Sequence, residues 1–351
     1  KDGRKKFGLF PVKVFVSRQI ELLPEKVLIQ GDGRMRYYLA PMEGITGYIY
    51  RRAQNALFPA FDKYFSPFLA PRPKKTFNSR EVKDILPENN EGMVLVPQIL
   101  TNRAEDFIRA AEKLLEYGYH EVNLNLGCPS GTVVSKGKGA GFLARPQMLE
   151  AFLEEIFSAF PVSADGESRM EISVKTRLGM EEAEEFLPLM ELYRRYPLKE
   201  LIIHPRVRED YYANRPDWDA FERALSGCPF PVVYNGDLFT VEDAARFQER
   251  FPQVDAVMLG RGAVADPSLI RQLRGGEALS GGELGDFLDR LAADYREVLS
   301  GERDVLFKLK ELWFYLGRLF PEEGTELKKI RKAQSLPEYR AAVRNLLRML
   351  G

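Results

Sequence analysis

Cysteine and histidine are scarce in this sequence, and their scarcity excludes several classes of protein. Of 351 residues, two are cysteine (Cys128 and Cys228) and two are histidine (His120 and His204). Two cysteines so far apart cannot form a disulfide framework, and none of the four residues stands at the spacing of zinc ligands. We therefore expect neither a structural disulfide nor a bound metal.

Long apolar runs are also missing. No stretch approaches the roughly 18 consecutive apolar residues of a membrane span, and the first residues lack the pattern of a secretory signal. We expect a cytoplasmic, monomeric protein that makes no contact with a membrane.

An excess of charge of one sign is absent as well, because 51 basic residues balance 51 acidic ones. The distribution of charge is more informative than the total. Between positions 328 and 348 the only acidic residue is Glu338, and the basic residues are Lys328, Lys329, Arg331, Lys332, Arg340, Arg344 and Arg348. Such a patch indicates a polyanionic partner, although a solvated helix face is the simpler interpretation of the patch alone. Residues 1–34 are also rich in basic residues, and we assign them to an N-terminal extension of unknown role.

A repeating unit organises positions 37–266: a short apolar run, a polar or glycine-containing stop, then a longer amphipathic stretch. The apolar runs, which we predict to be strands, span 37–40, 63–68, 93–98, 122–127, 171–177, 201–206, 231–236 and 256–261. Helices are predicted between them, for example over 103–117, 146–160, 182–196 and 241–250. Eight strand–helix units over about 230 residues predict an α/β fold of the (β/α)₈ TIM-barrel type, for which about 250 residues are typical.

A doubly wound open sheet is the structural alternative. It is disfavoured because no glycine-rich fingerprint follows the first apolar run. We assign residues 35–275 to the barrel and residues 276–351 to a small C-terminal helical domain.

Polar residues gather where the predicted strands end, which in a TIM barrel is the catalytic face. The residues at or just beyond these ends are Pro41, Met42, Gln98, Asn125, Cys128, Lys175, Arg177, His204, Arg206, Asn235, Gly236, Gly260 and Arg261. Side chains two residues apart share one face of a strand. The pairs related in this way are Asn123 with Asn125, Lys175 with Arg177, and His204 with Arg206. We expect all of these side chains to converge on one site at the mouth of the barrel.

The last two strand ends carry glycine-containing turns, NGD at 235–237 and GRG at 260–262. In barrels the loops after strands seven and eight frequently bind phosphate, and Arg261 can add a bidentate contact. Either turn alone is more simply a tight connection, but together they favour a phosphorylated cofactor. Thr240 and Asp243 predict a capping box that begins the following helix.

Seven segments together resemble the tRNA-dihydrouridine synthases, a flavin-dependent family. They are APMEGITGYIYRR (40–52), VPQI (96–99), NLNLGCPSGTVVSKGKGAGFL (123–143), SVKTRLG (173–179), IIHPRVREDYYANRPDW (202–218), NGD (235–237) and MLGRGAVADP (258–267). The NLGCP block with its glycine-rich continuation is highly specific, whereas the APM, HPR and GRG pieces are individually weak. The sequence departs from the family at Gly47, where Asp is common, and at 205–207, where Gly-Arg-Thr is common.

The resemblance implies an enzyme that reduces uridines in tRNA to 5,6-dihydrouridine, with FMN as cofactor, NADPH as reductant and Cys128 as general acid. The residues that it implies for FMN are Pro41, Met42, Gln98, Lys175, His204, Asn235, Gly236, Gly260 and Arg261. It places Asn125 near the uracil. We expect further substrate contacts from Arg177, Arg206, Lys136 and Lys138, and we expect the helical domain at 276–351 to bind the tRNA.

Reduction of uracil adds a hydride to carbon 6 and a proton to carbon 5. Reduced flavin can supply the hydride, and a thiol with a pKa of about 8.5 is still protonated at neutral pH. A lone cysteine is often only a small buried hydrophobe, but the position of Cys128 at the predicted mouth favours the acid role. Lys175 is expected to stabilise an anionic reduced flavin and His204 to bond the isoalloxazine or the phosphate, while His120 is expected to be structural.

The target base lies within a folded RNA and must be flipped into the site. The glycine-rich segment 130–141, which contains Lys136 and Lys138, is expected to be a mobile loop that closes over the site. Phosphate contacts should come from the C-terminal helices, predicted over 305–320 and 327–350. Within the first of these, we expect Trp313, Phe314 and Tyr315 to lie in the core of the helical bundle rather than to form a platform for base stacking.

Two other functions are compatible with the same barrel. An FMN barrel of the dihydroorotate dehydrogenase type would act on a free pyrimidine and would not need a basic helical tail. A barrel that binds RNA without catalysis would not need Cys128, Lys175 and His204.

Overall fold

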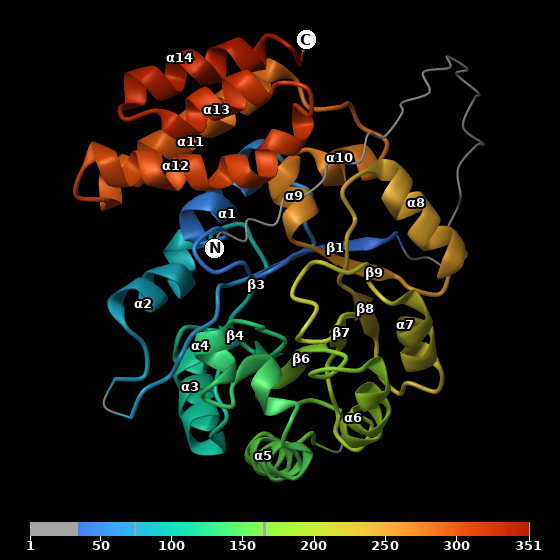
Figure 1. The fold of residues 1–351 in the computed structure, drawn as a ribbon. Coiled ribbons are helices and arrows are strands. Elements are labelled where there is room, and N and C mark those ends of the chain that lie inside the picture. The colour runs from blue at the N-terminus through green and yellow to red at the C-terminus, as the bar shows by residue number, and fades with distance from the viewer. Residues whose placement is uncertain (1–33, 74, 164–165, 351) are drawn as a thin grey trace, which may run out of the picture. The chain divides into compact units, whose positions relative to one another are not determined.

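The computed structural model describes residues 34–350 except 74 and 164–165. The predicted N-terminal extension therefore lies, apart from Arg34, outside the described residues. Residues 34–351 group into one compact unit, so the barrel and the C-terminal helices can be described in one frame (Figure 1). The position of the predicted boundary between residues 275 and 276 stays a prediction.

All paired strands of the barrel are parallel. They are β1 Arg36–Leu39, β2 Lys63–Phe65, β3 Leu95–Val96, β4 Gln98–Ile99, β5 Glu121–Leu126, β6 Glu171–Arg177, β7 Leu201–His204, β8 Val232–Tyr234 and β9 Ala256–Leu259. Each of the eight predicted apolar runs contains a strand, and the run at 93–98 contributes to two of them. The split falls at Pro97, which has no N–H to donate to the ladder.

The sheet closes on itself. Its strand order is β3-β2-β1-β9-β8-β7-β6-β5-β4, and β1 pairs with β2 on one side and with β9 on the other. The two ends of this order, β3 and β4, are separated in the chain only by Pro97. The Pro97 carbonyl accepts the Asn123 amide at 2.9 Å, which continues the contact with β5. The predicted TIM barrel is confirmed.

An apolar layer fills the barrel beneath its mouth. Its members are Tyr38, Ala40, Phe65, Val96, Ile202, Val233, Ala256 and Met258. Because side chains alternate along a strand, the next inward position lies two residues further on. After Val96, Ile202 and Val233, those positions are the polar residues Gln98, His204 and Asn235. Alternation therefore places a polar layer directly above the apolar one.

Helices surround the barrel and connect its strands. They are α1 Tyr48–Leu57, α2 Ser79–Ile85, α3 Ala104–Glu116, α4 Gly131–Val134, α5 Pro146–Ala159, α6 Phe186–Tyr193, α7 Trp218–Leu225, α8 Val241–Arg250, α9 Arg261–Ala265 and α10 Leu269–Leu273, with 3₁₀ turns η1 Pro87–Asn89, η2 Gly139–Phe142 and η3 Ala183–Glu185. The helix predicted over 182–196 is therefore the turn η3 followed by the shorter α6. The predicted capping box of α8 is confirmed: the Asp243 amide donates to Thr240 Oγ1 at 3.1 Å, and the Thr240 amide donates to Asp243 Oδ2 at 3.2 Å.

The C-terminal region is helical, as predicted, but the single helix predicted over 327–350 is wrong: the chain breaks at 333–335, where Ser335 caps the start of a second helix whose first turn contains Pro337. The region contains α11 Gly281–Val298, α12 Glu302–Leu316, η4 Gly317–Leu319, α13 Gly324–Lys332 and α14 Leu336–Leu347. These helices (orange to red) lie against α1 and α9 of the barrel (Figure 1). The contact with α1 is aromatic, since the Phe287 ring packs edge-on against Tyr50 and Phe58 at centroid distances of 5.6 and 5.8 Å.

Replacement of Phe287 by alanine should loosen this contact. The side chain is buried, and loss of a buried phenyl ring typically costs about 3–5 kcal/mol of unfolding free energy. Phe307→Ala on α12 is the control, because that ring is 54% exposed and its loss should cost less than about 0.5 kcal/mol. Urea unfolding of both variants measures the difference, and equal stabilities would contradict the docking of α11 on α1.

Candidate functional site

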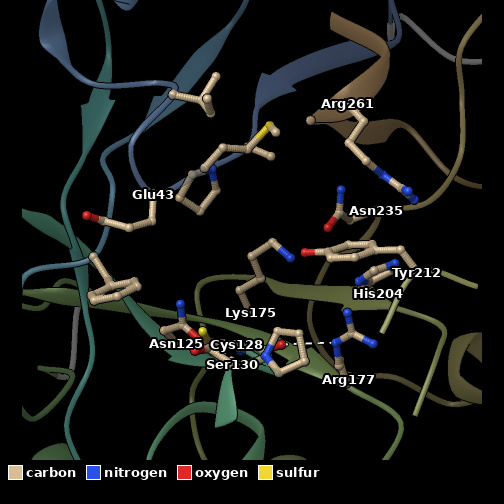
Figure 2. A pocket seen from close by; sticks show the side chains of 18 of the residues that line it. Glu43, Asn125, Cys128, Ser130, Lys175, Arg177, His204, Tyr212, Asn235 and Arg261 are labelled. Carbon is tan, nitrogen blue, oxygen red and sulfur yellow. Dashed lines mark hydrogen bonds between the residues drawn. The ribbon is translucent and has the colours of Figure 1, made fainter. Parts of the chain in front are cut away.

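A cavity of about 410 Å³ opens at the carboxyl ends of the strands. Its walls come from segments far apart in the chain: the ends of β1, β5, β6, β7, β8 and β9, the loop before α7, and helix α12. Figure 2 shows Lys175 near the middle of this cavity, with Cys128 and Asn125 on one side and Asn235 and Arg261 on the other. The convergence that strand parity predicts is therefore present except for Asn123 and Arg206, which do not line the cavity.

Most of the predicted site residues line this cavity. They are Pro41, Met42, Gln98, Asn125, Cys128, Lys175, Arg177, His204, Asn235, Gly236, Gly260 and Arg261. Every residue predicted to contact the cofactor is in this set. Of the predicted substrate contacts, the set holds Asn125 and Arg177.

A chain of amide hydrogen bonds crosses neighbouring strands in the polar layer. Asn125 Nδ2 donates to Gln98 Oε1 at 2.7 Å, Gln98 Nε2 donates to Asn123 Oδ1 at 2.8 Å, and Asn123 Nδ2 donates to Ser173 Oγ at 3.0 Å. The side chains of Gln98, Asn123 and Ser173 are fully buried. Because each polar group has a partner, the network holds these side chains in fixed orientations.

Asn125 also positions the cysteine. Its Oδ1 accepts the backbone amides of Gly127 and Cys128 at 3.1 and 3.0 Å, and this local turn directs the chain at the end of β5. The Cys128 carbonyl accepts the Ala140 amide at 3.1 Å, which ties the turn to η2. The cysteine is thus held on both sides by its own loop.

The Cys128 thiol is half-buried at the cavity wall. Burial raises its pKa above the usual value, and the Ser130 amide and the charges of Arg177 and Lys175 oppose this effect only in part. A thiol with a raised pKa is protonated at neutral pH, so Cys128 can donate a proton but is a poor nucleophile.

Lys175 is half-buried and has no acidic partner among the described residues. Burial, reinforced by the charge of Arg177, lowers its pKa to about 7. Among the described residues, no hydrogen bond or ion pair to its ammonium is found. A half-buried amine without protein partners must find them in water or in a ligand, so Lys175 marks a point where a bound molecule can present acceptor atoms or negative charge.

His204 is held neutral. Burial is the main cause of a pKa well below the usual histidine value, and four cations add to it: Arg177, Lys175, Arg206 and Arg261. The Arg206 guanidinium lies 2.9 Å from His204 Nε2. Since arginine can only donate, Nε2 accepts and the ring proton is on Nδ1. His204 can therefore offer one N–H donor to a ligand.

Arg177 holds two loops of the mouth together. Its Nε donates to the Gly127 carbonyl at 3.0 Å, and its terminal nitrogens donate to the carbonyls of Val207 and Tyr211 at 2.8 and 2.7 Å. Its guanidinium also lies 5.3 Å from the centre of the Tyr212 ring. Arg177 thus fixes the cysteine loop relative to the loop that follows β7.

The two predicted phosphate turns depend on glycine for close packing. A Cβ at Gly236 would lie 1.9 Å from the Tyr234 hydroxyl, and one at Gly262 would lie 1.9 Å from the Leu238 carbonyl. Asn235 Nδ2 donates to the Met258 carbonyl at 2.8 Å, which joins the ends of β8 and β9. The two turns are therefore locked together at one edge of the cavity.

Comparison with known proteins agrees with this geometry. The family model for dihydrouridine synthase matches residues 38–289, which is more than half of the chain. The chain belongs to the dihydrouridine synthase family. The resemblance found in the sequence motifs is thereby confirmed.

Similar relatives in this family carry the name tRNA-dihydrouridine(16) synthase. The protein from Ralstonia nicotianae is 29% identical over 332 residues, covering 90% of this chain and 97% of its own. The Cupriavidus necator protein is 30% identical over 246 residues, with 68% and 74% covered, and the Escherichia coli protein is 29% identical over 251 residues, with 68% and 76% covered. Among solved structures, morphinone reductase is similar with a TM-score of 0.47 and 14% identity, covering 72% of this chain and 88% of its own.

Three predicted substrate contacts do not line the cavity of this dihydrouridine synthase family member. Arg206 is buried, forms a salt bridge with Asp237 and donates to the Asn214 carbonyl at 2.6 Å, so it supports the loop before α7. Lys136 is exposed and Lys138 is half-buried, both outside the cavity wall. Contact of these three residues with the RNA stays a prediction.

The glycine-rich segment is not the open loop that the sequence suggested. It folds as α4 and η2 and packs tightly, because a Cβ at Gly141 would lie 2.6 Å from the Val134 carbonyl and one at Gly139 would lie 2.9 Å from Cys128 Cβ. Gly139 also has a positive φ of 55°. Here the glycines allow close packing beneath Cys128, and the segment is not the flexible loop that was predicted to close over the site.

Sequence reasoning missed several residues of the cavity wall: Glu43, Tyr212, Asp237 and Tyr315. Three of them lie within or next to the quoted motifs, and Asp237 pairs with both Arg206 and Arg261. Tyr212 covers the cations at the mouth, with Arg261 at 4.4 Å from its ring centre. Tyr315 comes from α12, far outside the motifs, and no local pattern in the sequence marks it.

Neither a metal cluster nor a membrane-spanning helix occurs in the described part of the chain. No group of acidic, histidine or cysteine side chains there is arranged to hold a metal ion. None of the helices described is both long enough and apolar enough to span a membrane.

The low pKa of Lys175 predicts a pH-dependent stability of the cofactor-free protein. A lysine in the unfolded chain has a pKa of about 10.4, against about 7 in the folded protein. Between these values the unfolded state binds more protons, so this group makes the folded state more stable as pH rises. From pH 7 to pH 9 the gain should be roughly 2 kcal/mol for wild type and absent in Lys175→Met.

Urea unfolding at the two pH values measures this gain, with Lys136→Met as a matched control because Lys136 is exposed. The control should keep the wild-type pH dependence. If Lys175→Met also kept the wild-type pH dependence of stability, the low pKa of Lys175 would not be its cause.

Proposed function

We propose that this chain binds FMN in the barrel cavity, receives reducing equivalents from NADPH, and reduces uridine in tRNA to 5,6-dihydrouridine. The observation that carries the proposal is the presence, in one cavity, of a protonated thiol and a half-buried lysine that has no partner among the described residues. A reduction that adds a hydride and a proton to a conjugated double bond needs a hydride source and an acid.

The residues of the cavity fit a flavin. Its volume of about 410 Å³ lies within the range of roughly 300–1,000 Å³ that is usual for small-molecule sites. The unpaired Lys175 ammonium is a donor for the polar edge of an isoalloxazine, and His204 offers its Nδ1 proton nearby. The turns at 235–237 and 260–262, with Arg261, would hold the phosphate at the opposite edge. When bound, FMN supplies the hydride that no protein side chain can provide.

Cys128 would deliver the proton to carbon 5 of the uracil. Its raised pKa keeps the thiol protonated, and Asn125 fixes the loop from which it projects. Lys175 lies close enough for its charge to lower the thiol pKa, so this cation favours the thiolate that remains after the proton has left. Cys128 thus donates the proton, and Lys175 stabilises the thiolate that remains.

Lys175 would have a second role toward the negative charge of a reduced cofactor. An amine with a pKa of about 7 takes up a proton readily when an anion appears beside it. Arg177 and Arg261 add positive charge to the same cavity. The two acidic residues of the cavity wall have other partners, Glu43 with Arg80 and Asp237 with Arg206 and Arg261. Lys175 therefore stays available to an electron-rich ligand.

The names of the relatives support tRNA as substrate and uridine 16 as the modified position. A free pyrimidine as substrate is disfavoured because the family match covers the whole barrel and relatives also match its C-terminal region. The C-terminal helices reach the cavity through Tyr315, which gives them a place in substrate binding.

Purified protein should be yellow and should release FMN on denaturation. The basis is the fit of Lys175 and of the two glycine turns to a flavin mononucleotide. Absorbance and mass spectrometry of the released compound identify it. Release of FAD, or failure to take up FMN on reconstitution, would contradict the cofactor assignment.

Cys128→Ala should retain FMN and the oxidation of NADPH but lose tRNA reduction by about 10²–10⁴-fold, the usual contribution of a positioned general acid. Cys228→Ala is the control, because Cys228 is the other half-buried cysteine and lies outside the cavity. It should keep both activities. Equal loss of NADPH oxidation in Cys128→Ala would mean that the thiol is structural.

A further inference from the structure

Helix α12 exposes two aromatic rings to solvent. The side chain of Phe314 is 82% exposed and that of Phe307 is 54% exposed. The prediction that residues 313–315 lie in the bundle core is correct for Trp313, which is buried and donates to the Tyr339 hydroxyl at 2.9 Å. It is wrong for Phe314 and Tyr315, since the first is exposed and the second lines the cavity.

The exposed rings form a stripe with basic side chains. Arg303, Phe307, Phe314 and Arg318 follow one another at spacings of four, seven and four residues, which places them on one side of a helical path. We call these four residues the α12 surface. The Arg303 guanidinium lies 5.7 Å from the Phe307 ring centre. The neighbouring Glu311 is paired with Lys308 at 2.7 Å and adds little net negative charge.

The α12 surface is continuous with the mouth of the barrel. Phe314 packs edge-on against Tyr315, with ring centres 5.2 Å apart, and Tyr315 lines the cavity. At the other end of the surface, the Arg318 guanidinium lies 3.9 Å from the centre of the Phe239 ring.

Arg318 also lines a second groove, of about 700 Å³, together with Arg215 and Arg246. Asp237 belongs to the walls of both cavities, so the groove begins where the main cavity ends. Within the part of the chain that the structure describes, neither Arg215 nor Arg318 forms a salt bridge.

We infer that the α12 surface stacks on unpaired bases of the tRNA next to the reactive uridine, with Phe314 as the main stacking residue. The inference rests on the proposed function. Exposed aromatic rings flanked by arginines are the combination that single-stranded nucleic acid requires, because the rings take the base faces and the arginines take the phosphates. A second copy of this chain or an apolar protein partner would gain nothing from Arg215 and Arg318, the two arginines that form no salt bridge within the described residues.

A second set of basic residues lies along α14: Arg340, Arg344 and, at its C-terminal cap, Arg348, which we call the α14 stripe. Arg340 on α14 is paired with Asp289 at 3.4 Å, and the aromatic residue beside it, Tyr339, is buried. The α14 stripe can therefore contact phosphates, but it has no exposed aromatic ring beside it for base stacking. We therefore assign the base contacts near the reactive nucleotide to α12. This helix lies directly against α9 of the barrel (Figure 1).

The test compares Phe314→Ala with Phe314→Trp and with Met148→Ala, in the FMN-loaded full chain. Met148 is the control, because it is an exposed apolar residue on α5, across the barrel from the C-terminal helices (Figure 1). Affinity for an unmodified tRNA transcript, KM and kcat for its reduction, NADPH oxidation without tRNA, and urea unfolding are measured for each protein.

Phe314→Ala should weaken tRNA affinity and raise KM about tenfold, as expected for the loss of one stacked base. NADPH oxidation and the unfolding midpoint should not change. Phe314→Trp should bind tRNA at least as well as wild type because the indole also stacks, and Met148→Ala should match wild type.

Wild-type affinity in Phe314→Ala would overturn the inference, as would a change in its oligomeric state with no change in tRNA binding. If wild type binds the transcript without reducing it, the proposed function fails while the binding comparison still decides the role of Phe314. If wild type does not bind tRNA at all, both fail.

Discussion

The site depends on the hydrogen bonds that the Arg177 guanidinium donates to the loops of the barrel mouth. The guanidinium lies buried at the end of β6 and donates to three carbonyls, those of Gly127, Val207 and Tyr211. The first belongs to the loop that carries Cys128, and the other two belong to the loop that brings Tyr212 over the cavity. A lysine at this position would provide one point charge and could not span these acceptors with a rigid fork. The mouth of the barrel is therefore shaped by a side chain whose donors are directed mainly at the protein itself.

The charge of Arg177 also sets the electrostatics of the cavity. Burial is the main reason that the pKa of Lys175 falls to about 7 and that the pKa of His204 lies well below its usual value, and the charge of Arg177 is the next largest cause of both shifts. For Cys128 the same charge opposes burial, which nevertheless wins and keeps the pKa of the thiol above its usual value. One cavity therefore contains a protonated Cys128 thiol, a neutral His204 and a Lys175 whose pKa lies near neutral pH. Such a cavity is suited to ligands that gain electron density.

The barrel and most of the cavity wall could be predicted from the sequence because both follow from short-range rules. Alternation along a strand decides which side chains point inward, and the carboxyl ends of parallel strands meet at one face. Tyr315 escaped prediction because its place depends on how α12 docks on α9, a tertiary contact with no local pattern. The segment 130–141 was misjudged because glycine permits close packing as readily as mobility, and only the neighbours of Gly139 and Gly141 distinguish the two.

The central claim is that this cavity reduces a uridine held in RNA, and the mass of the tRNA tests it most directly. An unmodified transcript incubated with the FMN-loaded protein and NADPH should gain the mass of two hydrogens, and fragmentation should place the gain at uridine 16. A gain at another uridine would correct the position and leave the chemistry standing. Oxidation of NADPH with no gain of mass in the tRNA, together with reduction of free uracil or orotate, would contradict the account.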